Sequence, residues 1–106
     1  MKTRPITLNG LVSNSPATIY TVIAGDSLYL RALVFQNPNT SGTNVVSVYL
    51  QPPDGTSRLW VQRELAPGDS LLITDHEFEE RTVIGASATT ASEVVWTLTA
   101  SAEAEV

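Results

Sequence analysis

Hydrophobic and polar positions alternate along this chain in short runs that are separated by turn residues. The clearest case is residues 19–35, in which two apolar runs rich in β-branched and aromatic residues flank the turn residues 24–27. Alternation with a period of two is typical of β-strands, and Gly25 followed by Asp26 favours a tight turn. The pattern predicts a strand, a turn and a second strand, which together would form a β-hairpin. Because both faces of the second strand are largely apolar, we expect it at the centre of a sheet.

The same alternation recurs in other segments of the chain. They lie at residues 6–8, 45–50, 58–65, 70–74, 81–86 and 93–101. The dipeptide Asn9-Gly10 is expected to end the first of them, and residues 37–43 are expected to form an exposed loop. No long run has the 3.6-residue period of a helix. The sequence therefore predicts an all-β fold, a single antiparallel β-sandwich or jelly-roll-like domain of about seven to eight short strands with essentially no helix.

The length of 106 residues and a hydrophobic content of 42% suit one domain with a single core. We expect residues 1–16 to form an N-terminal strand or arm and residues 17–106 to form the core sandwich. The chain has no cysteine, so its stability must come from the core or from assembly. Its start lacks the apolar stretch of a signal peptide and no run is long enough to span a membrane, so no membrane association is expected.

The charge of the chain argues against a nucleic-acid partner. The formal net charge is −5, and all but one of the eleven acidic residues lie beyond residue 53. A protein that binds a polyanion needs the opposite sign and a basic stripe. The N-terminal half is mildly basic, and we expect it to face any partner that is acidic.

A Gly-Asp-Ser-Leu string occurs twice, with serines at Ser27 and Ser70. One esterase family has its nucleophilic serine in this tetrapeptide, but such a serine needs a histidine base and an acid that orients it. The only histidine is His76, and the expected fold is not the α/β fold of those esterases. We interpret the string as one turn used twice and expect no enzymatic activity.

Two binding functions remain as alternatives at this stage. Residues 75–80 combine four acids with His76 and could hold a hard cation, but they lack the pattern of a calcium loop, and a solvated acidic loop is favoured. Several aromatic residues on predicted strands could stack on sugars, although core or interface positions are favoured for them: Trp60, Trp96, Tyr20, Tyr29 and Tyr49. We expect neither a metal nor a cofactor.

From residue 19 onward the sequence resembles a small family of virion proteins of tailed bacteriophages. The motifs that carry the resemblance are I-Y-T-V-x-A-G at residues 19–25, L-V-F-Q-N at 33–37, V-x-V-Y-L at 46–50, L-A-x-G-D at 65–69 and I-x-A-x-A at 84–88. Two features depart from the family: Ile23 replaces a common proline, and residues 75–80 are unusually acidic.

The resemblance implies a structural component of a virion that has no active site. The leading hypothesis is a capsid decoration (cement) protein, which binds the outside of the head and stabilises its lattice. Its partners would be the major capsid protein or other virion proteins, and its localisation would be the capsid surface after assembly in the cytoplasm of the bacterial host. We also expect a homo-oligomer, a dimer or a trimer. One alternative is a protein of the tail, neck or fibre, and another, of a different class, is a carbohydrate-binding or adhesin module.

Six residues form the candidate partner interface. Three are the basic residues of the N-terminal half, Lys2, Arg4 and Arg31. The others lie on the second strand of residues 19–35, where strict alternation places Tyr29, Leu33 and Phe35 on the same face as Arg31.

Overall fold

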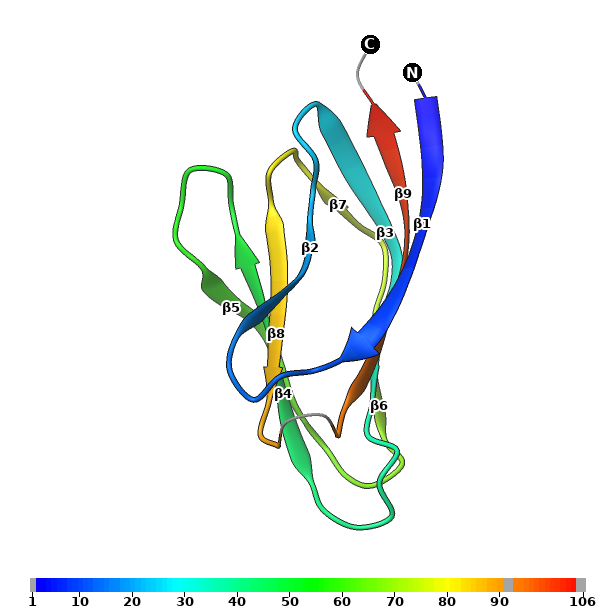
Figure 1. The fold of residues 1–106 in the computed structure, drawn as a ribbon, viewed down its shortest axis with the longest axis vertical. Coiled ribbons are helices and arrows are strands. Elements are labelled where there is room, and N and C mark those ends of the chain that lie inside the picture. Colours follow the sequence, from blue (N-terminus) through cyan, green and yellow to red (C-terminus); the bar gives the residue numbers. More distant parts are fainter. Residues whose placement is uncertain (1, 91–92, 105–106) are drawn as a thin grey trace.

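The computed structural model describes residues 2–90 and 93–104, which form two antiparallel sheets packed face to face (Figure 1). The strands of this described part are β1 (Lys2–Leu11), β2 (Ala17–Thr21), β3 (Asp26–Gln36), β4 (Asn44–Gln51), β5 (Arg58–Leu65), β6 (Ser70–Ile73), β7 (His76–Phe78), β8 (Val83–Ala88) and β9 (Val95–Ala104). The described residues include no helix, and so none that could cross a membrane. The all-β prediction is confirmed.

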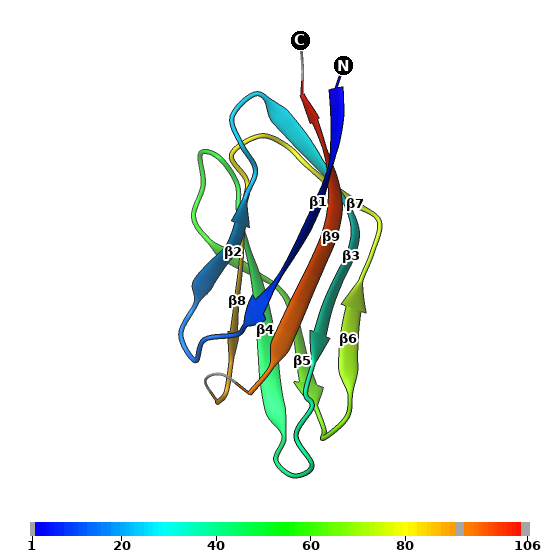
Figure 2. The ribbon, with the colours of Figure 1, turned by 45° about the vertical axis from the view of Figure 1, so that its right-hand side comes forward.

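The strand order defines a jelly-roll topology. Sheet A has the order β1-β9-β3-β6, and β7 pairs with a different part of β3 from the part that pairs with β6. Sheet B has the order β2-β8-β4-β5. If β6 and β7 are counted as one interrupted strand, the first strand pairs with the last, the second with the next to last, and so on inward. This nested pairing is that of a double-sheet jelly roll. Figure 2 shows β1, β9, β3 and β6 next to one another in the order of sheet A.

The core lies between the two sheets and is built from alternate residues of nearly every strand. Its largest fully buried side chains are Phe35, Leu28, Leu30, Leu33, Leu65, Ile84 and Leu98. Four of these come from β3, which pairs with β9 on one side and with β6 and β7 on the other. The prediction of a central strand in this position is therefore confirmed.

A β-bulge in β3 changes which of its side chains are buried. The register with β9 steps from Leu30 opposite Ala100 to Ala32 opposite Thr99, so Arg31 is an extra residue. One extra residue reverses the alternation beyond it. Leu33 and Phe35 are consequently fully buried on the core face, and the prediction that they share a face with Arg31 is wrong.

Residues 19–35 do not form a hairpin, because β2 belongs to sheet B and β3 to sheet A. The connection crosses from one sheet to the other, and Val22 within it is buried. The Val22 N–H donates to the Thr82 carbonyl at 2.9 Å, and the Arg81 N–H donates to the Val22 carbonyl at 2.8 Å. The crossing segment is thus paired with the residues that precede β8.

The two Gly-Asp-Ser-Leu strings adopt the same type of turn. The Asp26 N–H donates to the Ile23 carbonyl at 3.0 Å, and the Asp69 N–H donates to the Ala66 carbonyl at 2.9 Å. The glycine before each aspartate has a positive φ, +89° at Gly25 and +83° at Gly68. A positive φ at the third position is the mark of a type II turn. The interpretation of a repeated turn is confirmed.

Strand β1 continues through Asn9-Gly10, so the turn expected there is not formed. Gly10 is opposite Trp96 in the register of β1 with β9. A Cβ atom on Gly10 would lie 3.0 Å from Nε1 of Trp96. The glycine therefore gives room to the indole within a strand, a role that the dipeptide alone does not reveal.

The loop after β3 begins with a buried residue. Asn37 was expected to be exposed, but it is fully buried. Its Nδ2 donates to the carbonyl oxygens of Gly42 and Leu65, each at 3.0 Å. Such bonds to backbone oxygens compensate for the burial of a polar side chain and fix the loop at this end of the sandwich.

Candidate docking surface

The structure separates the six predicted interface residues into different environments. Leu33 and Phe35 are enclosed in the core because of the bulge in β3, so the prediction that they contact a partner is wrong for this fold. Tyr29 and Arg31 are exposed on β3, and Arg4 is exposed on β1. Lys2 is the first residue of β1, and its side chain lies outside the described part.

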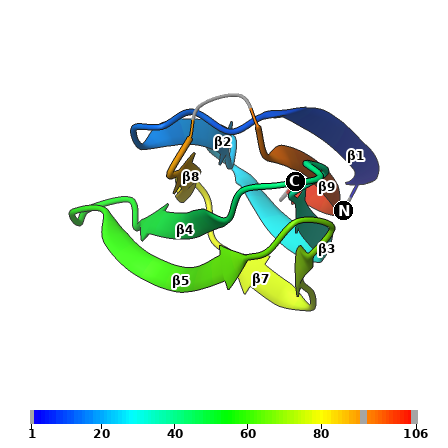
Figure 3. The same cartoon turned by 90° about the horizontal axis from the view of Figure 1, so that it is seen from below.

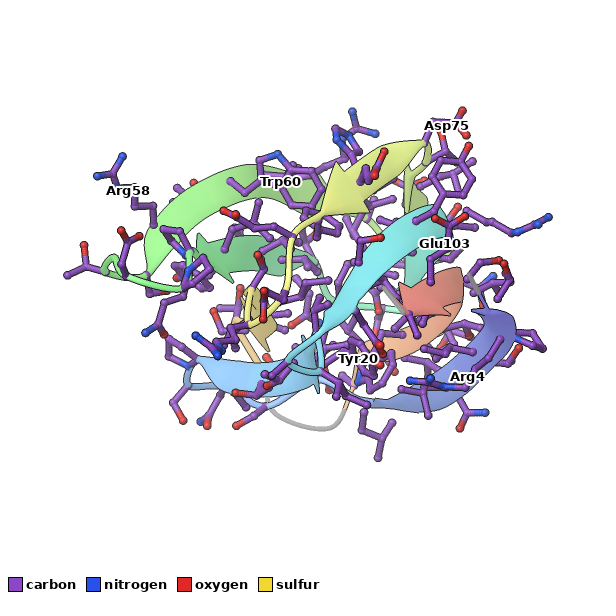
Figure 4. All side chains as sticks on the ribbon, turned by 90° about the horizontal axis from the view of Figure 1, so that it is seen from above. Arg4, Tyr20, Arg58, Trp60, Asp75 and Glu103 are labelled. Atoms are coloured by element: carbon purple, nitrogen blue, oxygen red, sulfur yellow. The ribbon has the colours of Figure 1, made fainter. Side chains whose placement is uncertain are left out.

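Arg4 interacts with a residue of its own sheet. Its Nη2 donates to Oδ2 of Asp26 at 3.0 Å, and the Asp26 carboxylate is buried. This hydrogen bond, together with the charge of Asp26, raises the pKa of the Arg4 guanidinium above its ordinary value. Figure 4 shows Arg4 and Tyr20 on the same side of this end of the sandwich, on β1 and β2. The Arg4 charge is thus partly balanced within the fold.

Four residues on the outer face of sheet A form a group that we call the sheet-A surface: Tyr29, Arg31 and Leu72, which are exposed, and Val34, which is half-buried. Val34 on β3 is directly opposite Leu72 on β6. Leu72 is 61% exposed and Tyr29 is 41% exposed. Arg31 is the bulged residue, and its Nε donates to Oγ of Ser101 at 3.3 Å. The bulge therefore adds an exposed guanidinium beside the aromatic and aliphatic side chains.

Tyr29 connects this surface to the edge of the sheet. Its hydroxyl donates to Oδ1 of Asp75 at 2.7 Å. That hydrogen bond and the negative charge of Asp75 raise the pKa of Tyr29. Asp75 has a φ of +57° and lies between β6 and β7. The bond fixes the orientation of the tyrosine ring and places it next to the interruption of the edge.

The opposite edge of sheet A is formed by β1. The Val12 N–H donates to the Val94 carbonyl at 2.9 Å, and the register with β9 continues without a shift from there back to Lys2. In an antiparallel pair the hydrogen-bonding direction alternates from residue to residue. The even-numbered residues of β1 therefore bond to β9, whereas the N–H and C=O groups of the odd-numbered ones point outward. Pro5 is one of the odd-numbered residues, so its lack of an N–H removes no hydrogen bond to β9.

A concave feature lies where β5 approaches β7. The register of β4 with β5 steps from Val48 opposite Val61 to Tyr49 opposite Leu59, so Trp60 is a bulged residue. Its ring contacts His76 and Phe78 edge to face, with ring centroids 4.7 Å and 5.7 Å away. Figure 3 shows β5 and β7 side by side. The aromatic contacts thus join an edge of sheet B to an edge of sheet A.

Beside these aromatic rings is a groove of about 500 Å³, which we call the Trp60 groove. Apolar residues dominate its lining, which also includes three charged residues: Leu50, Pro52, Leu59, Trp60, Phe78, Thr82, Arg58, Glu77 and Glu79. Arg58 extends outward, away from Trp60, in the view of Figure 4. The groove therefore offers an apolar floor rather than a converging set of polar groups.

The acidic segment 75–80 is not entirely a loop, because His76–Phe78 form β7. The side chain of Phe78 in this segment is buried. This burial holds the acid-rich segment against the core, where it pairs with β3. The Oε1 atom of Glu80 accepts from the N–H of Gly25 at 3.0 Å. In the described residues, no three acids or histidines are placed so that they could share a metal ion.

Comparison with known proteins gives a fold but no family. No protein-family model matches the chain, and no curated protein matches it. One solved chain, reported under the words "Bacillus endospore appendages form a novel family of disulfide-linked pili", is similar in structure with a TM-score of 0.65. The sequence identity is 12%, and the match covers 99% of this chain and 88% of that one. At this identity the likeness supports the small β-sandwich fold alone.

Proposed function

We propose that this chain is a structural subunit of a larger protein assembly, and specifically a decoration protein on the head of a tailed phage. The observation that carries the proposal is the sheet-A surface. It joins an exposed tyrosine, an arginine and an exposed leucine on one sheet face. Tyrosine and arginine are enriched in protein interfaces, and they are frequent among the residues that dominate binding energy.

Two further points support an assembly role. The motifs from residue 19 onward resemble virion structural proteins, as described above. The similar solved chain comes from endospore appendages that are described as disulfide-linked pili. The present chain contains no cysteine, so it cannot form disulfide links of that kind.

The proposed contact uses the sheet-A surface against the outside of the major capsid protein. Arg31 supplies a positive charge to an acidic partner surface, while Tyr29 and Leu72 supply apolar area. Arg4 contributes less in this proposal, because its guanidinium is already paired with Asp26. Binding of this kind would stabilise the lattice by linking neighbouring capsid subunits.

Cryo-electron microscopy of particles purified from the source of this chain tests the proposal. Ordered copies over the head lattice, with the sheet-A surface facing the capsid, are the expected result. Density confined to the tail, neck or fibres would move the protein to that alternative role. Particles that lack the chain altogether would overturn the proposal.

Variants test which surface makes the contact. Leu72→Glu places a charge in the sheet-A surface and should raise the dissociation constant for particles at least about tenfold, the effect of losing about 1.4 kcal/mol. The matched control is Leu59→Glu, because Leu59 is 53% exposed but lies on β5 of the other sheet. Equal loss of affinity with both variants, or loss with the control alone, would contradict a contact through the sheet-A surface.

A second candidate function is carbohydrate binding, which the Trp60 groove favours. A half-buried tryptophan over an apolar floor can stack on a sugar ring. The test is a glycan array probed with the purified chain and with Trp60→Ala. A glycan bound by the wild type and lost with Trp60→Ala, while Leu72→Glu still binds it, would support this function. No binding to any glycan would contradict it.

A further inference from the structure

The four sheet edges differ in how well they resist pairing with another strand. Edge strands are usually protected by short length, charges, bulges or interruptions. β2 has five residues and a register shift, and β5 contains Arg58, Arg63 and Glu64. The β6–β7 edge is interrupted at Asp75, whose φ is +57°. Each of these three edges therefore carries at least one protecting feature.

The protecting residues of the β1 edge, Lys2, Arg4 and Pro5, lie at its N-terminal end. The strand is ten residues long, and its register with β9 has no shift. From Pro5 to Leu11 the strand has no charged residue. Two of its leucines are exposed, Leu8 by 37% and Leu11 by 58%. Figure 3 shows β1 at the outer margin of sheet A, with β9 as its neighbour.

We propose that the β1 edge binds β1 of a second copy of this chain, antiparallel about a two-fold axis at Leu8. The two A sheets would then join into one continuous sheet. Thr7 would pair with the partner's Asn9, and Leu11 would lie opposite the partner's Pro5. Because an antiparallel pair of identical strands is symmetric, a single patch serves both copies.

The backbone of β1 fits this register. The new hydrogen-bonded pairs must come from odd-numbered residues, because their N–H and C=O groups point away from β9. Thr7 and the partner's Asn9 are both odd-numbered and exchange two hydrogen bonds, as do Asn9 and the partner's Thr7. Pro5 still offers its carbonyl to the N–H of the partner's Leu11. Each copy therefore loses one hydrogen bond of this pairing, because Pro5 has no N–H to donate to the carbonyl of the partner's Leu11.

The side chains also fit a second copy. Leu8 of each strand would lie opposite the partner's Leu8, in a pair whose Cα atoms are about 4.5 Å apart. Leu11 would lie beside the partner's Pro5, so both exposed leucines gain apolar neighbours. The antiparallel arrangement places Arg4 opposite the partner's Val12 and far from the partner's Arg4. A parallel arrangement in register would instead bring the like charges together.

The interface is small, so a weak dimer is expected, with a dissociation constant on the order of 100 μM. Such an affinity suits contacts between neighbours that are already close together on an assembly. The proposal does not depend on the nature of that assembly, because it concerns purified copies of the chain alone.

Sedimentation equilibrium from about 10 μM to about 1 mM tests the dimer. Two variants of β1 should weaken it at least about tenfold. Thr7→Pro removes an outward N–H that β9 does not use, and Leu8→Lys brings two ammonium groups together at the two-fold axis. Leu72→Lys, on the other edge of the same sheet, should leave the dimer unchanged. Circular dichroism and thermal melting establish that each variant is folded.

Each outcome decides the proposal. A concentration-dependent dimer that is lost with folded Leu8→Lys and kept with Leu72→Lys supports it. A monomer at every concentration overturns it. A dimer that survives Leu8→Lys also overturns it, because the contact must then lie elsewhere. If Thr7→Pro fails to fold because the proline ring fixes φ, Leu8→Lys decides between these outcomes by itself.

Discussion

The two edges of sheet A end the same sheet in different ways. On one side, β6 and β7 share the length of β3 and are separated at Asp75, which adopts a left-handed backbone conformation. On the other side, β1 pairs with β9 over ten residues without interruption. The broken edge presents two short strands to solvent, whereas the continuous edge presents a regular row of backbone groups. The continuity of the backbone is therefore one feature that determines which edge is available to a partner.

The strongest test of this difference concerns the hydrogen-bonding direction along β1. Leu8→Pro removes an N–H that points toward β9, so it should lower the free energy of unfolding by about 3 kcal/mol or more. Thr7→Pro removes an outward N–H and should cost less than about 1 kcal/mol. Urea denaturation measures both variants, and Leu8→Ala accounts for the lost side chain. Equal costs for the two prolines would contradict the inferred direction.

The next prediction concerns the contact between Gly10 on β1 and Trp96 on β9. A Cβ at Gly10 would lie 3.0 Å from Nε1 of Trp96, so Gly10→Val forces the indole to move. We expect a loss of about 1–3 kcal/mol in the free energy of unfolding and a change in tryptophan emission. Gly10→Ala should have a smaller effect of the same sign. Full stability in Gly10→Val would mean that Trp96 does not restrict this end of the continuous edge.

The interrupted edge depends on the backbone of Asp75. Asp75→Val places a β-branched residue at a φ of +57° and should cost about 1–2 kcal/mol in the free energy of unfolding. Asp75→Asn should keep most of the stability, because asparagine tolerates the left-handed region. Thermal unfolding of the two variants gives the comparison. Equal stability of Asp75→Val and Asp75→Asn would show that the interruption does not need this conformation.

The smallest expected effect is the titration of Tyr29 beside the same aspartate. The hydrogen bond to Asp75 raises the pKa of Tyr29 above the ordinary value of about 10. A raised pKa in the folded state means that this stabilisation is complete below the ordinary pKa and is lost as the pH rises through the raised one. Absorbance titration should show a late titration step that is absent in Tyr29→Phe and occurs at lower pH in Asp75→Asn. An unchanged titration in Asp75→Asn would contradict the contact.

Much of the fold could be predicted because its signals are local. Period-two alternation and turn residues predicted a strand at residues 58–65, which β5 matches, and a strand at 70–74, which β6 matches within one residue. The repeated Gly-Asp turn was also predicted. These features depend on neighbours in sequence, so one chain is enough to find them.

The pairing of strands was harder to predict because a turn does not show which sheet the next strand joins. The turn at Gly25 leads β2 of one sheet to β3 of the other, yet a hairpin would need the same residue types. The bulge at Arg31 was also missed, and with it the burial of Leu33 and Phe35. An extra residue leaves no mark in the sequence, although it reverses every later position in the strand.

The candidate surfaces were found in part. Tyr29 and Arg31 were predicted as interface residues, and the structure places them on an exposed face. Leu72 was missed, although it is the outward position of the short run Leu71-Leu72-Ile73. The β1 edge was missed because Asn9-Gly10 was interpreted as a turn that ends the strand. The close approach of Gly10 to Trp96 depends on a residue far away in sequence.

Hydrogen exchange of single amides, measured by NMR at low and high protein concentration, tests the claim of an open β1 edge most directly. In dilute solution the amides of Ile6, Leu8 and Gly10 should be protected, whereas those of Thr7, Asn9 and Leu11 should exchange quickly. At high concentration the second group should become protected as a second copy pairs with β1. Protection of Thr7, Asn9 and Leu11 in dilute monomer, or rapid exchange at every concentration, would contradict the account.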